Sequence, residues 1–582
     1  MWEKTLPWVQ TFPGINGYFC KRHKTIRDMK RFLCWAFALT MCLAAAAQPG
    51  QMPQNVILTA RATSPIMYGG PTRAEGRSYN FTPVFFIYPD TKLDQDGAAK
   101  LLEDLAIQLL LDSEYGTAMV INPVGDKYAA EADFEAFVNL FNASRGPGNL
   151  KVVGIGQGAT FVNQVIAPKA AGQIAGILTV GGKPGKTVDT AGVPAYVAGK
   201  GAAKVAKPYQ AAVAAHADEP LLQVVVNPSE KASLKDVFAD AWKRVLGRNY
   251  RYNNYNHTHY EGAKFGEYGS YELEPYLDCE SLGIKRIIVE QPMGQRTSQG
   301  QDVPKQLWYE YWPEELLDGA PAQSVPVMVL LHGNQNDPRT QAETSGFIQL
   351  ASEKRFFVVE MEWQGTPNYQ AMGHDGIESV LYQLFAKYPQ LDPSRVYAEG
   401  LSAGSITATA LGIKKSYLFT AVGGHSGGIF GGPFKGYTSF DILWAEATQK
   451  RGAVEVPYCS VFGTKDNVVP YIKPDNWKDN NYLNAWNAYE QMNGMEVVRD
   501  IDFSIDKVFG QPLRDRETIV TNKGDGITIE TGVLYKGDVP MIKMVAVMDY
   551  GHWNFMPTAR IMWDFFLHYR RDPETKKLIY IP

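Results

Sequence analysis

The stretch Arg395-Val-Tyr-Ala-Glu-Gly-Leu-Ser-Ala-Gly404 decides the fold class of this chain. An apolar strand runs directly into Gly400-Leu401-Ser402-Ala403-Gly404, which has the G-x-S-x-G pattern of a sharp strand-to-helix turn. Such a turn strains the backbone of its central serine, and only small residues two positions away let the helix pack against the strand. The pattern predicts that Ser402 is a nucleophile, although a motif this short also arises by chance and needs its partners.

Those partners follow Ser402 in chain order. Val456-Pro-Tyr-Cys-Ser-Val-Phe-Gly463 is a predicted buried strand, and Asp466 lies in the loop after it. Met541-Ile-Lys-Met-Val-Ala-Val-Met548 is another predicted strand, and His552 lies between it and a predicted helix over residues 558–568. A serine hydroxyl becomes a good nucleophile when an imidazole takes its proton and a carboxylate orients that imidazole. We expect Asp466 to be the acid and His552 the general base.

Other residues compete for these two roles. The competing carboxylates are Asp441, Asp475 and Asp549. Each of them can equally be a solvated loop residue, whereas Asp466 follows the end of a predicted strand. His568 also follows the acid candidate, but it lies in an aromatic-rich predicted helix where a packed or surface role is more natural.

An oxyanion hole is expected from two places in the chain. The apolar run Pro326-Val-Met-Val-Leu-Leu331 ends in His332-Gly333-Asn334, where a loop can aim a backbone N–H at a substrate carbonyl oxygen. The N–H of Ala403, at the start of the helix after Ser402, would be the second donor. His332 precedes the serine in the chain, so we expect its side chain to shape the loop.

Three aromatic residues follow predicted strand ends or loops. They are Trp363, Tyr369 and Trp553. They could line an apolar cleft for the acyl group, which would suit aromatic or hydroxyalkanoate acyl groups. Ordinary packing explains each of them equally well.

Four motifs occur in a fixed order along the second half of the chain. They are Leu331-His-Gly-Asn-Gln-Asn-Asp337, the run from Asp392 to Gly404, Phe462-Gly-Thr-Lys-Asp-Asn-Val-Val-Pro-Tyr471 and Gly551-His-Trp553. Together they resemble secreted esterases similar to polyhydroxybutyrate depolymerases and feruloyl or acetyl-xylan esterases. The resemblance implies an α/β-hydrolase fold, a mixed and mostly parallel sheet with helices on both faces, with Ser402, Asp466 and His552 at the triad positions. Members often have Cys where this chain has Asn334, and Gly where it has Ser405.

The first half of the chain repeats the pattern of the second. Thr82-Pro-Val-Phe-Phe-Ile-Tyr88 parallels Val325-Pro-Val-Met-Val-Leu-Leu331, and Leu150-Lys-Val-Val-Gly-Ile-Gly-Gln-Gly158 parallels the serine turn, with Gly156 in place of the serine. Further parallels follow at residues 193–199 and 221–246. Residues 52–248 therefore have the pattern of a second, smaller α/β-hydrolase-like unit.

Every catalytic position of that unit is replaced. The replacements are Tyr88-Pro-Asp90 at the oxyanion loop, Gly156 at the nucleophile, Gly199-Lys-Gly-Ala-Ala-Lys204 at the acid and Asn227-Pro-Ser-Glu230 at the histidine. A dinucleotide-binding loop is the alternative, but no acidic residue ends a following strand at the usual distance. We expect a degenerate, non-catalytic domain over 52–248, a linker over 249–268 and a catalytic domain over 269–582.

The first 47 residues are expected to be an upstream extension plus a signal peptide. Met29-Lys-Arg-Phe-Leu-Cys-Trp-Ala-Phe-Ala-Leu-Thr-Met-Cys-Leu43 combines a charged start with an apolar stretch, and the alanines before Gln48 suit cleavage near Ala47. The stretch is short for a transmembrane anchor. We expect an exported protein, periplasmic or extracellular, with no integral membrane span in the mature form.

Composition and the remaining reactive residues limit the partners. The chain has 582 residues, 45% apolar and 20% charged, and a net charge of −4 gives no electrostatic reason to expect nucleic acid. A disulfide between Cys279 and Cys459 stays undecided. His257-Thr-His259 has no third ligand in sight, so no metal is expected.

The leading hypothesis is an exported serine esterase that forms an acyl-enzyme and needs no cofactor. Its partner would be a small-molecule or polymeric ester, such as a plant-polysaccharide ester or a polyester, and the sequence does not indicate an oligomeric state. Two alternatives remain open. A peptidase of the same fold would use the same triad, and a surface glycan- or polymer-binding protein would keep only a residual hydrolase domain.

Overall fold

The computed structural model describes residues 52–63, 82–144, 146–216, 219–252, 264–266, 272–292, 305–334, 336, 338–366, 369–429, 454–521 and 527–582. The predicted signal peptide, the pair His257 and His259, most of the predicted linker and Asp441 lie outside these residues. Within them, the main chain forms two large sheets and two small two-stranded ones.

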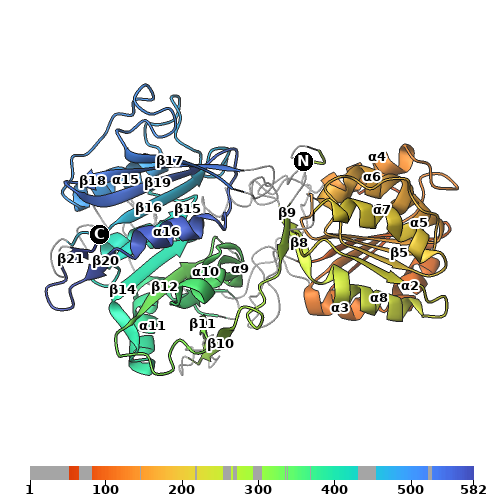
Figure 1. Cartoon of the computed structure of the whole chain (residues 1–582), viewed down its shortest axis with the longest axis horizontal. Helices are drawn as coiled ribbons and strands as arrows, with labels where there is room; N and C mark the ends of the chain where they lie inside the picture. The colour runs from red at the N-terminus through yellow and green to blue at the C-terminus, as the bar shows by residue number, and fades with distance from the viewer. Residues whose placement is uncertain are drawn as a thin grey trace, which may run out of the picture. The chain divides into compact units, whose positions relative to one another are not determined.

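The first large sheet, coloured orange to yellow in Figure 1, has seven strands. Their order is β1-β3-β2-β4-β5-β6-β7. They are β1 (Val56–Arg61), β2 (Val84–Tyr88), β3 (Thr117–Ile121), β4 (Leu150–Ile155), β5 (Gly176–Val180), β6 (Ala195–Ala198) and β7 (Val224–Asn227). Only β1 is antiparallel to its neighbour. The parallel strands are nearly continuous apolar runs because helices cover both of their faces.

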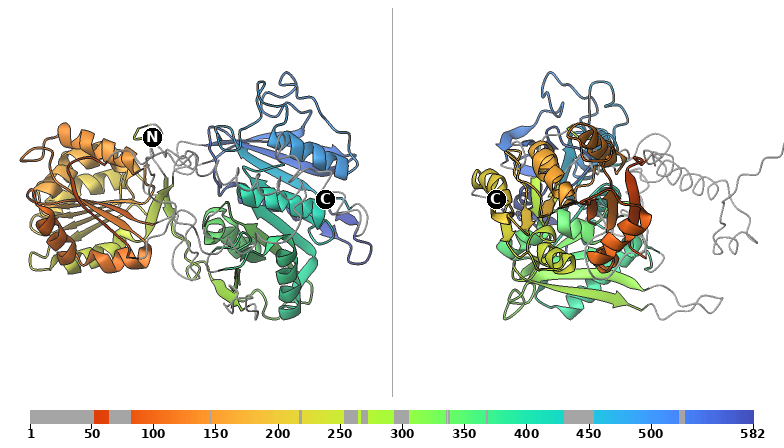
Figure 2. Two further views of the ribbon diagram at one scale, coloured as in Figure 1. Left: turned by 180° about the vertical axis from the view of Figure 1, so that it is seen from behind. Right: turned by 90° about the vertical axis from the view of Figure 1, so that its right-hand side faces the viewer.

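Helices lie on both faces of this sheet, as Figure 2 also shows from behind. One face carries α4 (Ala132–Ala143), the run α5 (Gln157–Phe161), η2 (Val162–Ile166), α6 (Ala167–Ala170) and η3 (Ala171–Gln173), and α7 (Ala202–Ala214). The other face carries α2 (Gln95–Asp104), α3 (Ile107–Glu114) and α8 (Leu234–Ala241) with η4 (Trp242–Leu246).

The second large sheet has ten strands in the order β10-β11-β13-β12-β14-β15-β16-β19-β18-β17. They are β10 (Ile284–Gln291), β11 (Gln306–Pro313), β12 (Val325–Leu331), β13 (Phe357–Met361), β14 (Leu391–Gly400), β15 (Ala421–His425), β16 (Tyr458–Gly463), β17 (Arg514–Val520), β18 (Thr528–Lys536) and β19 (Val539–Val547). The six central strands, from β13 to β19, are parallel, and the strands at both edges are antiparallel.

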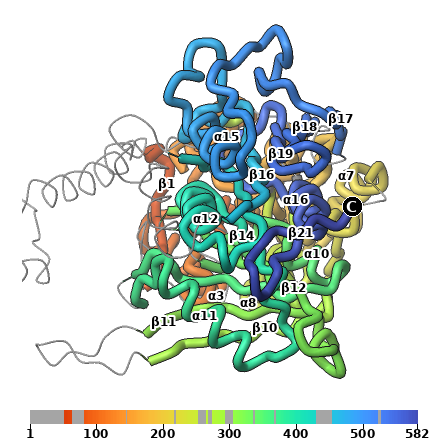
Figure 3. Tube along the Cα trace, turned by 90° about the vertical axis from the view of Figure 1, so that its left-hand side faces the viewer, coloured from red at the N-terminus to blue at the C-terminus, as the bar shows by residue number. Residues whose placement is uncertain are grey.

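Helices also cover both faces of the second sheet (Figure 3). One face carries α11 (Gly373–Lys387), α12 (Ala403–Lys414) and α15 (Asn481–Met492), and the other carries α9 (Arg339–Thr344), α10 (Phe347–Lys354) and α16 (Thr558–Phe566). The predicted strands before and after Ser402, and the predicted helices after Ser402 and His552, are thereby confirmed.

The two large sheets share one topology. Without its edge strand β10 and the hairpin β17–β18, the second sheet reads β11-β13-β12-β14-β15-β16-β19, which matches the first sheet strand for strand in chain order. The helices after corresponding strands also lie on corresponding faces. This correspondence is what the internal repeat in the sequence predicts.

The first residues of the expected linker form a strand. β8 (Asn249–Tyr252) pairs antiparallel with β9 (Glu272–Pro275) in a two-stranded sheet of their own. A second small sheet joins β20 (Tyr569–Arg571) to β21 (Leu578–Tyr580). Among the described residues, no helix combines the length and apolar character needed to cross a bilayer.

Candidate functional site

Ser402 occupies a strained turn between β14 and α12. Its backbone has φ 54° and ψ −116°, a region that residues with a side chain rarely adopt. A Cβ added at Gly400 would lie 2.4 Å from the carbonyl carbon of Gly404, and one added at Gly404 would lie 2.0 Å from the Leu331 carbonyl oxygen. Both glycines are therefore required for α12 to approach β12 and β14, as the motif predicts.

The register of the parallel strands brings the candidate residues to one edge of the sheet. Leu331 at the end of β12 pairs with Gly400, and the Ser402 N–H donates to the His425 carbonyl at the end of β15 (2.9 Å). Next along this edge, Gly463 at the end of β16 pairs with Val547 of β19. Asp466 and His552 follow these last two strands, so they lie at the same edge as Ser402.

Asp466 and His552 form a hydrogen-bonded pair. His552 Nδ1 lies 2.8 Å from Asp466 Oδ2, and the two residues are 7% and 5% exposed. The other carboxylate oxygen, Oδ1, accepts the backbone N–H groups of Val468 and Val469, both at 2.8 Å. One oxygen therefore anchors the carboxylate to its own loop while the other orients the imidazole.

The two loops that carry this pair are also bonded to each other. The Asp549 N–H donates to the Thr464 hydroxyl, and the Lys465 N–H donates to the Tyr550 carbonyl, both at 2.8 Å. Within the described residues, the hydrogen bond to Asp466 is the one side-chain hydrogen bond of His552, so none joins His552 to Ser402. The hydrogen bond between a general base and its nucleophile commonly tightens only when substrate binds.

The competing residues lie elsewhere or are solvated. Asp549 is 80% exposed and forms a surface ion pair with Lys465, and Asp475 is exposed. His568 is half-buried just beyond α16, with Nδ1 2.8 Å from the Ile581 carbonyl. Among the described candidates for acid and base, the structure brings Asp466 and His552 together.

The loop after β12 lies against the serine turn. A Cβ added at Gly333 would be 3.5 Å from the Leu401 carbonyl oxygen, and the Asn334 side chain accepts a hydrogen bond from Gln364 Nε2 (2.9 Å). His332 is 1% exposed, and its Nε2 lies 3.3 Å from a carboxylate oxygen of buried Glu362. The His332 carbonyl accepts the indole N–H of Trp363 (3.0 Å). The buried His332 side chain therefore helps to hold the shape of this loop.

The three candidate substrate-binding aromatics are mainly packed. Trp553 is 5% exposed and Tyr369 is 7% exposed, and both belong to the core beneath α10 and α16. The Tyr369 hydroxyl donates to Glu290 of β10 (2.6 Å). Trp363 is partly exposed and packs against the opposite core. The geometry supports packing for Tyr369 and Trp553 and leaves Trp363 as the more accessible of the three.

A buried polar cluster that the sequence motifs do not predict lies beneath the serine turn. It consists of Gln341, Glu399, His425, Asn554 and Thr558. The available signal was Glu399, a charged residue directly after the apolar run Val396-Tyr397-Ala398 and two positions before the turn's leucine.

The turn at Gly156 keeps the backbone shape of the serine turn. Gly156 has φ 55° and ψ −111°, and its N–H donates to the Val180 carbonyl as the Ser402 N–H does to that of His425 (both 2.9 Å). Asp90 Oδ1 accepts the Gln157 N–H (2.7 Å), which corresponds to the Ala403 N–H. A Cβ on Gly156 would lie 1.9 Å from that same oxygen. The Asp90 carboxylate therefore fills the space that a nucleophile and an oxyanion would need.

Replacing Gly156 with serine is expected to lower the local stability of the first sheet by about 2–4 kcal/mol, from backbone strain and from the clash with Asp90. Native-state hydrogen exchange of the β4 amides in the full chain measures this change. Gly201→Ser is the matched control, because Gly201 also has positive φ but no atom within 4 Å of an added Cβ. The double variant Asp90→Gly/Gly156→Ser should be more stable than Gly156→Ser alone. Equal protection in the two would refute the clash.

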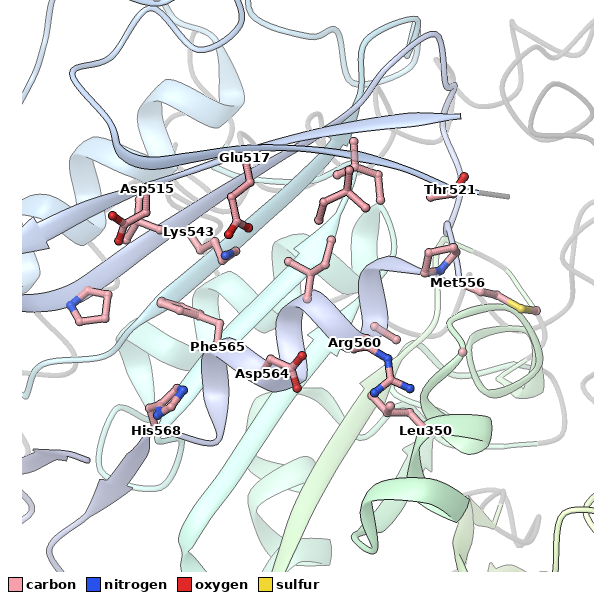
Figure 4. Close-up of a pocket in the computed structure, with 18 of the residues that line it drawn as sticks. Leu350, Asp515, Glu517, Thr521, Lys543, Met556, Arg560, Asp564, Phe565 and His568 are labelled. Atoms are coloured by element: carbon pink, nitrogen blue, oxygen red, sulfur yellow. The ribbon is translucent and has the colours of Figure 1, made fainter. Parts of the chain in front are cut away.

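A large groove lies away from this site. Its volume is about 870 Å³, and its lining comes from β17–β19, α10 and α16. Figure 4 shows Asp515 and Glu517 on the β17 side, facing Arg560, Asp564 and Phe565 on α16. Neither Ser402, Asp466 nor His552 lines it. The size of this groove alone assigns no chemistry to it. The strained serine and the paired histidine instead favour the sheet edge that carries Ser402 and His552 as the functional site.

The two cysteines beyond the predicted signal peptide are unbonded. Cys279 and Cys459 are both free thiols. Burial raises the pKa of Cys279 to about 11 and that of Cys459 to about 12, so neither is a reactive thiolate at neutral pH. No group of three or more candidate metal ligands occurs in the described part of the chain.

The order of the second sheet, with a serine on a strained turn after β14 and a histidine after β19, defines an α/β-hydrolase fold. Residues 311–458 match the family model described as esterase, PHB depolymerase. This match confirms the resemblance that the motifs predict, and it supports a carboxylic ester hydrolase of the α/β-hydrolase type. It includes Ser402 and ends before Asp466 and His552.

Solved structures with similar folds include esterases and peptidases. The acetyl xylan esterase from Aspergillus awamori is 14% identical over 48% of this chain and 98% of its own, with a TM-score of 0.33. A mutant of the feruloyl esterase module from Clostridium thermocellum, complexed with sinapinate, is 13% identical over 48% and 87%, with a TM-score of 0.30. The acylaminoacyl peptidase of Pyrococcus horikoshii is 14% identical over 39% of each chain, with a TM-score of 0.26. None of the curated proteins matches the sequence significantly.

Proposed function

We propose that the protein is a serine esterase with Ser402 as nucleophile, His552 as general base and Asp466 as the carboxylate that orients it. The observation that carries the proposal is the 2.8 Å contact between His552 Nδ1 and Asp466 Oδ2, at the sheet edge where Ser402 occupies its strained turn. Asp466 keeps the proton of His552 on Nδ1, which leaves Nε2 free to accept the proton of the Ser402 hydroxyl.

The reaction proceeds through an acyl-enzyme. The Ser402 oxygen attacks the ester carbonyl as His552 takes its proton, and the backbone N–H groups of the loop Gly333–Asn334 and of Ala403 stabilise the oxyanion. His552 then protonates the departing alcohol. Water repeats the sequence on the acyl-enzyme, which returns a carboxylic acid and free Ser402. None of these steps requires a cofactor.

The substrate class follows from the family resemblance and from the accessible aromatic residue. Esters of plant polysaccharides and polyesters are the proposed substrates, with Trp363 beside the oxyanion loop as a contact for the acyl group. The proposal includes export after cleavage near Ala47. Residues 52–248 are proposed to be a degenerate, non-catalytic copy of the fold, joined by residues 249–268 to a catalytic domain over 269–582; the shared strand order supports this division.

The proposal predicts covalent labelling of one serine. A fluorophosphonate probe should attach to the folded, full-length protein at Ser402, because the paired histidine activates that hydroxyl alone. Peptide mass spectrometry of the labelled protein identifies the site. A folded protein that stays unlabelled, or a label within residues 52–248, contradicts the proposal.

A substrate panel then separates the alternatives. Nitrophenyl butyrate, methyl ferulate, acetylated xylan and a polyhydroxybutyrate film test the ester classes, and a peptide nitroanilide tests the peptidase alternative. We expect hydrolysis of esters and no measurable hydrolysis of the anilide. Preferential cleavage of the anilide would favour the peptidase.

A further inference from the structure

A buried polar network links the strand of Ser402 to the loop of His552. Glu399 lies in β14, three residues before Ser402, and is fully buried. Its two carboxyl oxygens start two separate arms. Oε1 lies 3.2 Å from His425 Nδ1, and Oε2 accepts a hydrogen bond from Gln341 Nε2 (2.7 Å).

The first arm runs through His425 to Thr558. His425 Nε2 lies 2.6 Å from the Thr558 hydroxyl, which itself donates to the Phe555 carbonyl (2.6 Å). Because the hydroxyl hydrogen is used in that second bond, Nε2 is the donor to Thr558. This arm therefore ends at Thr558 and Phe555, which lie at the two ends of the turn between His552 and α16. His425 also supplies the carbonyl that holds the Ser402 N–H.

The second arm runs through Gln341 to Asn554. The Gln341 side chain accepts from Asn554 Nδ2 (2.9 Å), and the same nitrogen donates to the Thr344 hydroxyl (2.7 Å). The Asn554 carbonyl accepts the hydroxyl of Tyr550 (2.6 Å). Asn554 is two residues after His552, so this arm also ends on the loop that carries the histidine.

The degenerate copy of the fold provides an internal comparison. Glu399 pairs with Leu330 of β12, and at the same register Val153 pairs with Ile87 of β2. His425 bridges to Leu401, and Val180 pairs with Ile155. Valine therefore occupies both positions in the copy that lacks the serine. The fold forms with apolar residues there, and buried polar pairs are in general weak contributors to stability.

We propose that Glu399 is a positioning residue that fixes the His552 loop against the serine turn, through His425 and Thr558 on one side and Gln341 and Asn554 on the other. This inference rests on the proposed esterase function. The network is too buried to meet a substrate, so Glu399 acts through the loop. A displacement of about 1 Å in a catalytic group can cost about 100-fold in rate.

The test introduces the residues of the degenerate copy. In Glu399→Val/His425→Val, kcat for nitrophenyl butyrate should fall about 100-fold while KM stays within about twofold. Thr558→Val is nearly isosteric and cuts one arm, so it should lower kcat about tenfold. Glu399→Gln should rescue most of kcat, because its amide oxygen can accept from Gln341 while its NH₂ group donates to a neutral His425.

Tyr397→Phe is the matched control. Tyr397 lies on β14 two residues before Glu399, is equally buried, and its hydroxyl donates to the Tyr569 carbonyl (3.0 Å), away from the His552 loop. It should lower thermal stability without lowering kcat. An unchanged kcat in the folded double valine variant or in Thr558→Val, or an equal loss in Tyr397→Phe, would overturn the inference. An inactive wild-type protein would instead overturn the esterase proposal.

Discussion

Replacing Ser402 with alanine is expected to lower kcat by about 10⁶-fold, the loss typical of removing the nucleophile from a serine triad. Alanine occupies the strained φ of 54° no less easily than serine does, so the turn should survive. The residual rate would come from binding and the oxyanion donors alone. Steady-state hydrolysis of nitrophenyl butyrate measures the effect.

Ser405→Ala is the matched control for this variant. Ser405 lies three residues further along α12, is 1% exposed, and its hydroxyl has no hydrogen-bond partner among the described residues. Removing that hydroxyl should leave kcat within about twofold and should not lower stability, because no bond is lost. If Ser402→Ala retained more than about a hundredth of the wild-type kcat, another nucleophile would have to be sought.

The features that local sequence encodes were predictable. The glycines around Ser402 are dictated by contacts with the Leu331 carbonyl and with each other, so the spelling of the motif carries the geometry. The strands before Asp466 and His552 are short apolar runs, and the copy of the fold follows from repeated spacing. Each of these signals lies within a few residues of the feature that it predicts.

Features that depend on register or on distant pairing were not predictable. β17 is almost wholly exposed because it is a charged edge strand. It therefore lacks the alternation of apolar and polar residues that would reveal a strand. The pairing of β8 with β9 joins segments separated by more than a dozen residues. The contact between Glu399 and His425 depends on the pairing of neighbouring strands. The contact between Asp90 and the Gly156 turn depends on the path of the loop after β2.

Replacing Asp466 with asparagine is expected to lower kcat about 10⁴-fold with little change in fold. The geometry determines how the amide must lie. Oδ1 accepts two backbone N–H groups, from Val468 and Val469, so the amide oxygen stays on that side. The NH₂ group then faces His552 Nδ1 and donates to it, which moves the imidazole proton to Nε2. In that tautomer His552 cannot accept the proton of Ser402.

Asp549→Asn is the matched control, because Asp549 carries the same change of charge three residues before His552. Its side chain is 80% exposed and pairs with Lys465 at the surface, so kcat should stay within about twofold. Parallel pH profiles of kcat/KM for the two variants and the wild type measure the contrast at every pH. A full effect in Asp549→Asn and none in Asp466→Asn would assign the acid to Asp549. Such a result would also mean that the bond between His552 and Asp466 is rearranged before the reaction, since an exposed carboxylate can orient the imidazole only after that loop has moved.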